Sequence, residues 1–166
     1  WGGYNAFTDK DGKRKQFRMV GEETGAQLGH NLDTLSICYA GNFTVRPDNT
    51  LVELPTSQQR FDLLNLLSEI LDGNIRKVLA VLPGTQTNFS ITRIFPHRNL
   101  QVGRPTQCFG NALPDDFARS LLKNYYQDKL AILQKLLYFY LKLQDNKLGG
   151  AGSNSCLYED NSVKIF

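Results

Sequence analysis

The chain is organised around the sequence PHRNL at residues 96–100, which is followed after a short basic loop by TQCFG at residues 106–110. His97 is one of two histidines and Cys108 is one of three cysteines. We expect a β-strand over residues 90–95, which would place His97 at a strand end and Cys108 on the next loop. Imidazole and thiolate are the ligand types that suit zinc best. On its own, the pair is weak evidence for a metal site, because a strand-end histidine and a buried free thiol are the more common explanation.

Length and composition indicate one globular domain with an appendage, since the chain has 166 residues. The net charge of +3 is too small for a typical nucleic-acid-binding protein. It is compatible with an anionic polymer such as a bacterial cell wall. Three cysteines without a repeated spacing do not indicate a disulfide framework. The sequence shows no recognisable signal peptide and no apolar run long enough to span a membrane.

The first part of the chain has the pattern of a small sheet. Residues 1–20 predict a β-hairpin that turns at Asp11–Gly12, and residues 21–31 predict a loop. Residues 34–40 form a continuous β-prone run, apolar on both faces, which indicates a central strand. The expected fold is therefore α/β, with a mixed central sheet that includes strands at 34–40 and 90–95 and is flanked by helices.

Two helices are expected against the faces of this sheet. Thr56 is a good N-cap and Gln59 completes a capping box, so the first helix covers residues 56–71. Acidic residues at 115 and 116 favour the start of a second helix, over 115–124. Residues 75–82 fit either a short strand or an extra helical turn.

A C-terminal helical extension is expected over residues 125–147, where two apolar stripes alternate three- and four-residue spacings. The first stripe comprises Leu130, Leu133, Leu137 and Tyr140, and the second comprises Ile132, Leu136, Phe139 and Leu143. Such a helix packs on its own domain, or it mediates self-association or docking into a larger phage or cell-wall assembly. The predicted division is 1–124 for the domain, 125–148 for this helix, and 149–166 for a linker and tail in which Cys156 has no assigned role.

Several segments, taken together and in order, carry a family resemblance over roughly residues 1–123. They are GYNAF at residues 3–7, DG at 11–12, GAQLGHN at 25–31, SICYAGNF at 36–43, PTSQQ at 55–59, PHRN at 96–99 and TQCFG at 106–110. In this order they resemble the zinc-dependent N-acetylmuramoyl-L-alanine amidases, a group that includes phage lysozymes of the amidase type and the peptidoglycan recognition proteins.

The resemblance implies hydrolysis of the amide between N-acetylmuramic acid and L-alanine in peptidoglycan, by a phage or bacterial lytic enzyme. It implies a Zn²⁺ site with two histidines and a cysteine or aspartate, of which His97 and Cys108 match the second and third ligands. Three ligands leave a fourth position for the attacking water. The family tyrosine matches Tyr4, which would hydrogen-bond that water or the carbonyl. Thr106 matches the position that stabilises the oxyanion.

The main departure from the family is the first zinc ligand, which would lie upstream of the Tyr4 segment. The chain does not begin with Met, so we expect it to continue upstream; otherwise another segment supplies the ligand or the protein is inactive. His30 matches a structural position of the family rather than a ligand.

The alternatives to an active amidase are a non-catalytic peptidoglycan-binding module and an assembly subunit with an amidase-like fold. Cys38 lies mid-strand and is expected in the core. The expected place of action is the cell wall, with the protein extracellular, periplasmic or virion-associated.

Overall fold

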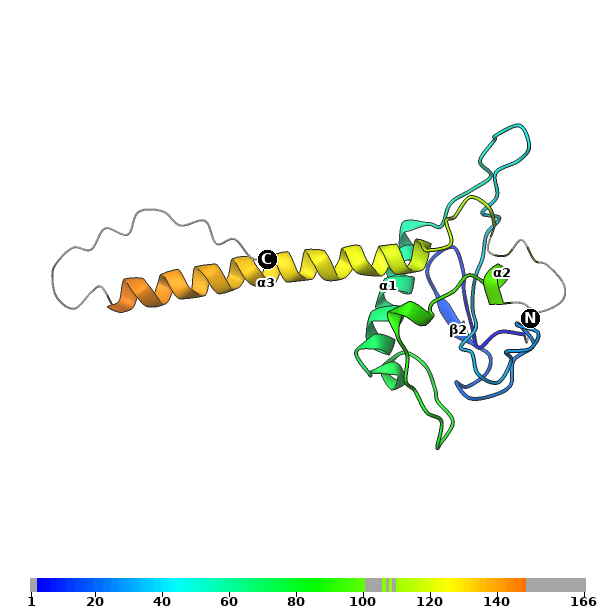
Figure 1. Ribbon diagram of the computed structural model, residues 1–166, viewed down its shortest axis with the longest axis horizontal. Helices are drawn as coiled ribbons and strands as arrows, with labels where there is room; N and C mark the ends of the chain where they lie inside the picture. Colours follow the sequence, from blue (N-terminus) through cyan, green and yellow to red (C-terminus); the bar gives the residue numbers. More distant parts are fainter. Residues whose placement is uncertain (1–2, 101–105, 107, 109, 149–166) are drawn as a thin grey trace. The chain divides into compact units, whose positions relative to one another are not determined.

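The computed structural model describes residues 3–100, Thr106, Cys108 and residues 110–148 (Figure 1). The chain divides into two compact units, one up to Tyr126 and the other from Gln127 onward. The first unit has an α/β fold, with a small mixed sheet and helices. The predicted linker and tail, including Cys156, lie outside the described residues.

The sheet has three short strands in the order β2-β1-β3. β1 (Ala6–Thr8) and β2 (Arg14–Gln16) are antiparallel and form the predicted hairpin, which is confirmed. β3 (Ile37–Tyr39) pairs with β1 in parallel. Gly12 has φ +78° in the hairpin turn, and an added Cβ would lie 2.8 Å from the carbonyl oxygen of Gln58. The turn therefore needs glycine for both its backbone conformation and its close approach to the next helix.

The prediction that residues 34–40 form a central strand is wrong in one respect. A strand is present, but β1 is the middle strand and β3 is an edge strand among those described. Cys38 pairs with Phe7, whereas Ile37 pairs with Ala6. Because side chains alternate along a strand, Cys38 and Ile37 lie on opposite faces of the sheet. A continuous apolar run does not reveal this difference in surroundings.

The predicted strand at residues 90–95 is absent. Ile91–Arg93 instead form a 3-10 turn, η2, and His97–Leu100 form the short helix α2. The Ser90 hydroxyl accepts a hydrogen bond from the Thr92 amide at 3.3 Å, and the Ser90 carbonyl accepts one from the Arg93 amide at 2.9 Å. Local bonding of this kind competes with sheet pairing for the same backbone groups. His97 therefore begins a helix rather than following a strand.

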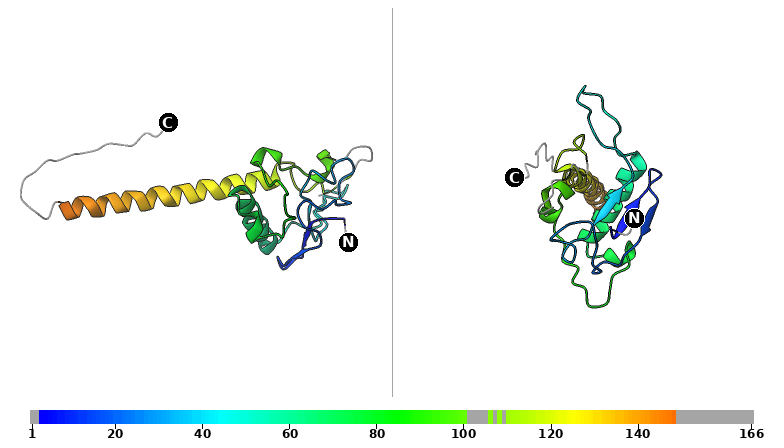
Figure 2. Two further views of the ribbon diagram at one scale, coloured as in Figure 1. Left: turned by 90° about the horizontal axis from the view of Figure 1, so that it is seen from below. Right: turned by 90° about the vertical axis from the view of Figure 1, so that its right-hand side faces the viewer.

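The first predicted helix is confirmed as α1 (Ser57–Leu71), with Thr56 as its N-cap. The Gln59 amide donates to the Thr56 hydroxyl, and the Thr56 amide donates to Gln59 Oε1, each at 3.1 Å. Gln59 Nε2 also donates to the carbonyl of Ala40 at 2.8 Å, which ties the start of α1 to the end of β3. α1 lies beside the three strands (Figure 2).

Residues 75–82, for which the sequence fits either a short strand or a helical turn, contain a 3-10 turn, η1 (Ile75–Lys77). A parallel bridge between Val81 and Val20 follows it.

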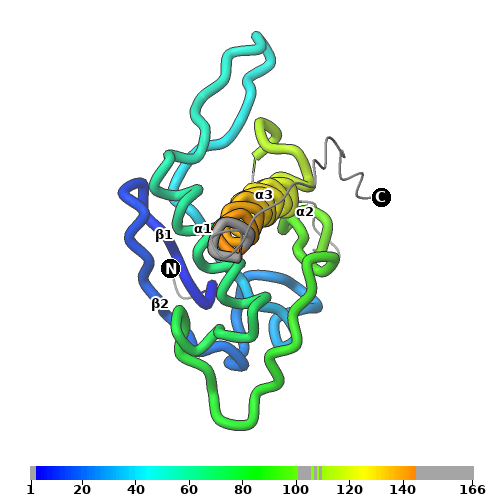
Figure 3. Tube along the Cα trace, turned by 90° about the vertical axis from the view of Figure 1, so that its left-hand side faces the viewer, coloured from blue at the N-terminus to red at the C-terminus, as the bar shows by residue number. Residues whose placement is uncertain are grey.

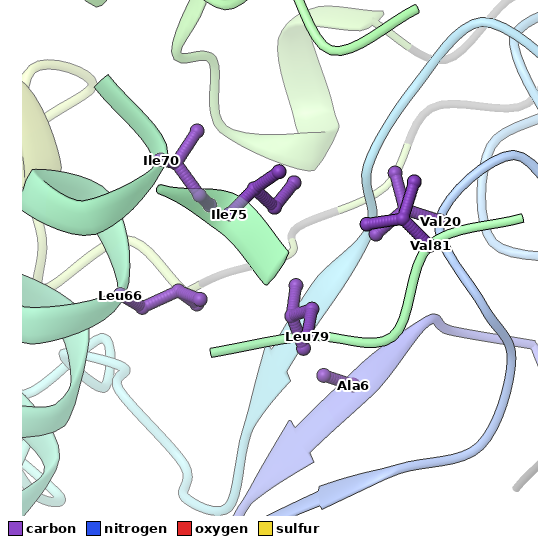
Figure 4. Close-up of a cluster of buried hydrophobic side chains, with 7 residues drawn as sticks. All are labelled: Ala6, Val20, Leu66, Ile70, Ile75, Leu79 and Val81. Carbon is purple, nitrogen blue, oxygen red and sulfur yellow. The ribbon is translucent and has the colours of Figure 1, made fainter. Parts of the chain in front are cut away.

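The main core lies between α1, η1 and β1 (Figure 4). It comprises Ala6, Val20, Leu66, Ile70, Ile75, Leu79 and Val81. Two longer loops extend away from the main core of the first unit. They lie around residues 44–52 and around residues 83–89 (Figure 3). The first of them is closed by a bridge between Val45 and Leu51.

A buried polar network lies beside this core and is centred on Asp62 of α1. Its carboxylate forms an ion pair with Arg14 and accepts hydrogen bonds from the Thr8 hydroxyl at 2.8 Å and the Tyr39 hydroxyl at 3.2 Å. The network joins all three strands to α1, because Thr8, Arg14 and Tyr39 come from β1, β2 and β3.

The two helices predicted over 115–124 and 125–147 are one continuous helix, α3 (Phe117–Leu148). Within the first unit, Leu122 is fully buried and the Tyr126 hydroxyl donates to Asp72 at 3.2 Å. In the second unit, side chains 127–144 are exposed. Among the described helices, none combines the length and apolar character that crossing a membrane requires.

Candidate functional site

A cavity of about 980 Å³ lies in the first unit and is lined by three of the predicted site residues, Tyr4, His97 and Cys108. Its walls come from the start of the chain, from β3, from one side of α1 and from the segment that runs from η2 to the start of α3. This volume is at the upper end of the range for small-ligand sites, about 300–1,000 Å³. The fold therefore brings residues from opposite ends of the first unit's sequence to one cavity.

His97 presents two uncommitted ring nitrogens at this cavity. Both nitrogens are shielded from solvent, and neither has a hydrogen-bond partner among the described residues. Burial lowers the pKa of His97, which favours the neutral imidazole at neutral pH. A neutral imidazole has a free lone pair, the form in which histidine binds a metal ion. Buried polar atoms without hydrogen-bond partners are uncommon, so the two nitrogens make His97 a candidate ligand-binding residue.

Cys108 is half-buried and lines the same cavity. Its carbonyl accepts a hydrogen bond from the Arg98 amide at 3.0 Å, which joins the cysteine loop to the residue after His97. Burial raises the pKa of the Cys108 thiol, and the positive charge of Arg98 partly offsets this rise. The thiol therefore stays protonated at neutral pH.

Thr106 has a different position from the other predicted residues. Its hydroxyl accepts a hydrogen bond from the Cys108 amide at 3.2 Å. Unlike Cys108, it is not among the cavity-lining residues in the described part of the chain. This contact caps the loop, and the role of Thr106 as an oxyanion donor stays a prediction.

Tyr4 is half-buried, with its side chain close to two thiols. Burial is the main cause that raises the pKa of Tyr4, and negative charge on Cys38 or Cys108 would raise it further. The phenol therefore keeps its proton at neutral and mildly alkaline pH. It is available as a hydrogen-bond donor at the cavity wall.

Cys38 is a cavity residue that the sequence does not reveal as one. The sequence places it in the core, but it is half-buried, lines the cavity and lies close to Tyr4. Its pKa is raised by burial and by the nearby Cys108. Its neighbours in β3, Ile37 and Tyr39, line the cavity as well.

Arg98 is a second residue whose role the sequence does not reveal. Its guanidinium donates to the carbonyls of Gly110 at 2.7 Å and Leu113 at 3.0 Å, and it forms an ion pair with Asp115. Together with the bond from its amide to Cys108, these contacts hold the chain after the cysteine against α2. An Arg immediately after a candidate ligand, followed by acidic residues at the next helix start, is a signal that could have suggested this arrangement.

The donor set suits a zinc ion in kind, since an imidazole and a thiol on one cavity are ligands that zinc prefers. However, the described residues contain no group of three or more His, Cys, Asp or Glu side chains arranged to hold a metal ion. His30 also lines the cavity, but its Nδ1 lies 3.2 Å from the Asp33 carboxylate and its carbonyl accepts a hydrogen bond from Thr34. Of the predicted ligands, His97 and Cys108 lie on the cavity, and Cys38 is a further thiol there. The structural role of His30 stays a prediction.

No protein-family model matches the sequence, and no curated protein matches it. Two solved structures resemble the fold, both from Clostridium intestinale URNW: the endolysin N-acetylmuramoyl-L-alanine amidase LysCS and the N-acetylmuramoyl-L-alanine amidase LysC. Each is 22% identical to this chain, with a TM-score of 0.50 over 73% of it. The chain spans 63% of the first structure and 64% of the second, which is less than two thirds of either. This likeness confirms the predicted fold class.

Proposed function

We propose that this chain carries the catalytic site of a peptidoglycan hydrolase, a zinc-dependent N-acetylmuramoyl-L-alanine amidase. The observation that carries the proposal is the meeting of Tyr4, His97 and Cys108 on one cavity. The fold that creates this cavity resembles two amidases, which adds support. The substrate would be the amide bond between N-acetylmuramic acid and L-alanine, and the place of action would be the bacterial cell wall.

His97 and Cys108 would provide two of the three protein ligands. A zinc ion held there would polarise the scissile carbonyl and lower the pKa of the attacking water. His97 is suited to this role because burial keeps its imidazole neutral. Cys108 would release its proton on binding the cation, which makes the affinity for metal increase with pH.

Tyr4 would act on the substrate rather than on the metal ligands. Because its phenol stays protonated, it can donate a hydrogen bond to the substrate carbonyl as negative charge develops on the oxygen. Thr106 would contribute a second donor after a small change in its loop, since its hydroxyl now accepts from the Cys108 amide. Removal of one such donor costs on the order of 10²–10³ in kcat in well-studied enzymes.

The test measures bound zinc and amide hydrolysis on the natural-length protein. Cys108→Ala should remove the metal and the activity. Cys38→Ala is the matched control for zinc content, because Cys38 is also a half-buried thiol on the same cavity. It does not serve as a control for hydrolysis, because Cys38 lies close to Tyr4. Activity is read as new amino termini on L-alanine released from purified peptidoglycan. Full zinc content and unchanged hydrolysis in Cys108→Ala would exclude this residue as a ligand.

A non-catalytic peptidoglycan-binding module is the second candidate. The observation that favours it is that the described residues contain no group of three or more His, Cys, Asp or Glu side chains arranged to hold a metal ion. In that case the natural-length protein would contain no zinc but would still sediment with cell walls. Tyr4→Ala would then weaken binding to the walls, whereas Cys108→Ala would leave it unchanged.

A further inference from the structure

The second unit contains a long stretch of α3 with an unusually apolar surface. Ten large apolar or aromatic side chains between Leu130 and Leu143 are 52–62% exposed. A contiguous exposed surface of this kind usually marks an interaction site. None of these ten side chains lines the cavity, so a role for this surface is independent of the proposed amidase activity.

The exposed side chains include the two stripes defined from the sequence, and both repeat every seven residues. In the first stripe Leu130 and Leu133 are followed by Leu137 and Tyr140. In the second, Ile132 and Leu136 are followed by Phe139 and Leu143. At 3.6 residues per turn, the two stripes and the adjoining Leu141 cover an arc of about 200°. That is about twice the width of the roughly 100° stripe by which a surface helix packs on one core.

The face of the helix opposite the two stripes is narrower than the apolar arc and carries the charged side chains. Within residues 130–143 the only charged side chains are Lys135 and Lys142, which are seven positions apart and share one face. Lys142 Nζ lies 5.7 Å from the centre of the Tyr138 ring, which keeps this aromatic side chain on the polar side. On the first stripe, Gln144 donates a hydrogen bond to the Tyr140 hydroxyl at 2.7 Å, so the polar end of this tyrosine is satisfied within the helix.

We propose that residues 130–143 of α3 associate with the same segment of other copies of this chain, in a parallel bundle of three or more helices. The two stripes differ in sequence and position, so the first stripe of one copy packs on the second stripe of the next. Such contacts are heterologous and close only as a ring. A two-stranded coiled coil would cover one stripe and leave the other in water.

The arrangement of charge favours copies of this chain over a lipid surface. A helix that lies on a membrane has a polar face rich in Lys and Arg. Here the polar face of residues 130–143 has only two charged side chains, Lys135 and Lys142. In a bundle of copies both lysines point outward. Lys129, one residue before this segment, falls between the two stripes and therefore lies at the end of the contact.

The size of the contact determines the expected strength. Each stripe offers four large side chains, whereas a standard interface has roughly 20–30 residues on each side. We therefore expect the association to depend on concentration rather than to be permanent.

The test is sedimentation equilibrium of the chain over a wide concentration range, in reducing buffer so that cysteines do not cross-link it. Wild type should approach a mass at least three times that of the 18.8 kDa chain. Leu133→Lys alters the first stripe and Leu136→Lys the second, and each should weaken association by roughly tenfold or more because it places a charge in an apolar contact. Ala131→Lys adds the same charge near the middle of the polar face and should leave the mass unchanged. Circular dichroism and the thermal midpoint check that each variant is folded.

Three outcomes would overturn the proposal. A dimer as the largest species, or sensitivity to only one of the two stripe variants, would exclude the ring of two-stripe contacts. A protein that stays monomeric at its solubility limit would exclude self-association. If that monomer also binds vesicles of phosphatidylcholine and phosphatidylglycerol, the apolar surface is a lipid-binding face instead.

Discussion

Arg98 holds the carboxylate of Asp115 through its guanidinium, with Nε donating to Oδ1 at 2.8 Å. Asn99 Nδ2 donates to the other carboxylate oxygen at 2.8 Å. Asp115 is thereby fixed by two consecutive residues of α2 shortly before α3 begins. Because these contacts lie on both sides of the Cys108 loop in sequence, they position Cys108 relative to His97.

We predict that Arg98→Ala weakens zinc binding although it removes no ligand. It removes two hydrogen bonds to backbone carbonyls, worth about 1–3 kcal/mol of unfolding free energy in total. Arg98→Lys keeps the charge but loses the forked geometry, so it should restore part of the stability and little of the metal affinity. Urea unfolding and zinc titration check this. Equal metal affinity in wild type and Arg98→Ala would contradict the positioning role.

We predict that Arg14→Ala strongly destabilises the first unit. It leaves the buried Asp62 carboxylate without its ion-pair partner, and breaking a buried pair in this way typically costs about 3–5 kcal/mol. Lys10→Ala serves as the control, because Lys10 pairs with Glu53 at an exposed position, with 58% of the lysine side chain accessible. Urea denaturation should separate the two variants clearly. Similar midpoints for both would show that Asp62 is solvated.

We predict that metal-free protein loses stability as the pH falls through the titration of His97. The pKa of His97 is lowered in the folded state from its ordinary value of about 6.5. Below that pH the unfolded chain therefore binds more protons than the folded protein. The free energy of unfolding is unaffected by this group above about pH 6.5 and decreases as the pH falls toward the lower pKa of the folded state. Unfolding free energies measured from pH 7.5 to pH 5 should show a weaker pH dependence in His97→Gln. An identical slope in the two proteins would contradict the burial of the imidazole.

We predict that Gly110→Ala disrupts the loop that follows Cys108. Gly110 has φ +91°, and an added Cβ would lie 1.9 Å from the carbonyl oxygen of Phe43. Gly84→Ala is the matched control, since Gly84 has φ +79° with no atom within 4 Å of an added Cβ. The control should cost about 1–2 kcal/mol for its backbone conformation alone, and Gly110→Ala should cost clearly more. Thermal unfolding of both variants measures the difference.

Several features were predictable because short-range interactions determine them. The capping box of Thr56 and Gln59 defines the start of α1, and the Asp-Gly turn defines the β1–β2 hairpin. The expectation that Tyr4, His97 and Cys108 converge came from the resemblance of ordered segments, and they do line one cavity. Their chemical roles remain predictions.

Elements whose hydrogen bonds close within a few residues could be predicted from the sequence, as could the seven-residue repeat of the two stripes on α3. The 3-10 turn at residues 91–93, the cavity position of Cys38 and the contacts of Arg98 with the cysteine loop depend on the tertiary structure. This is because β-prone residues form a strand only where a neighbouring strand is available to pair with them. In the same way, the role of a half-buried thiol or a guanidinium depends on partners that distant parts of the chain bring to it.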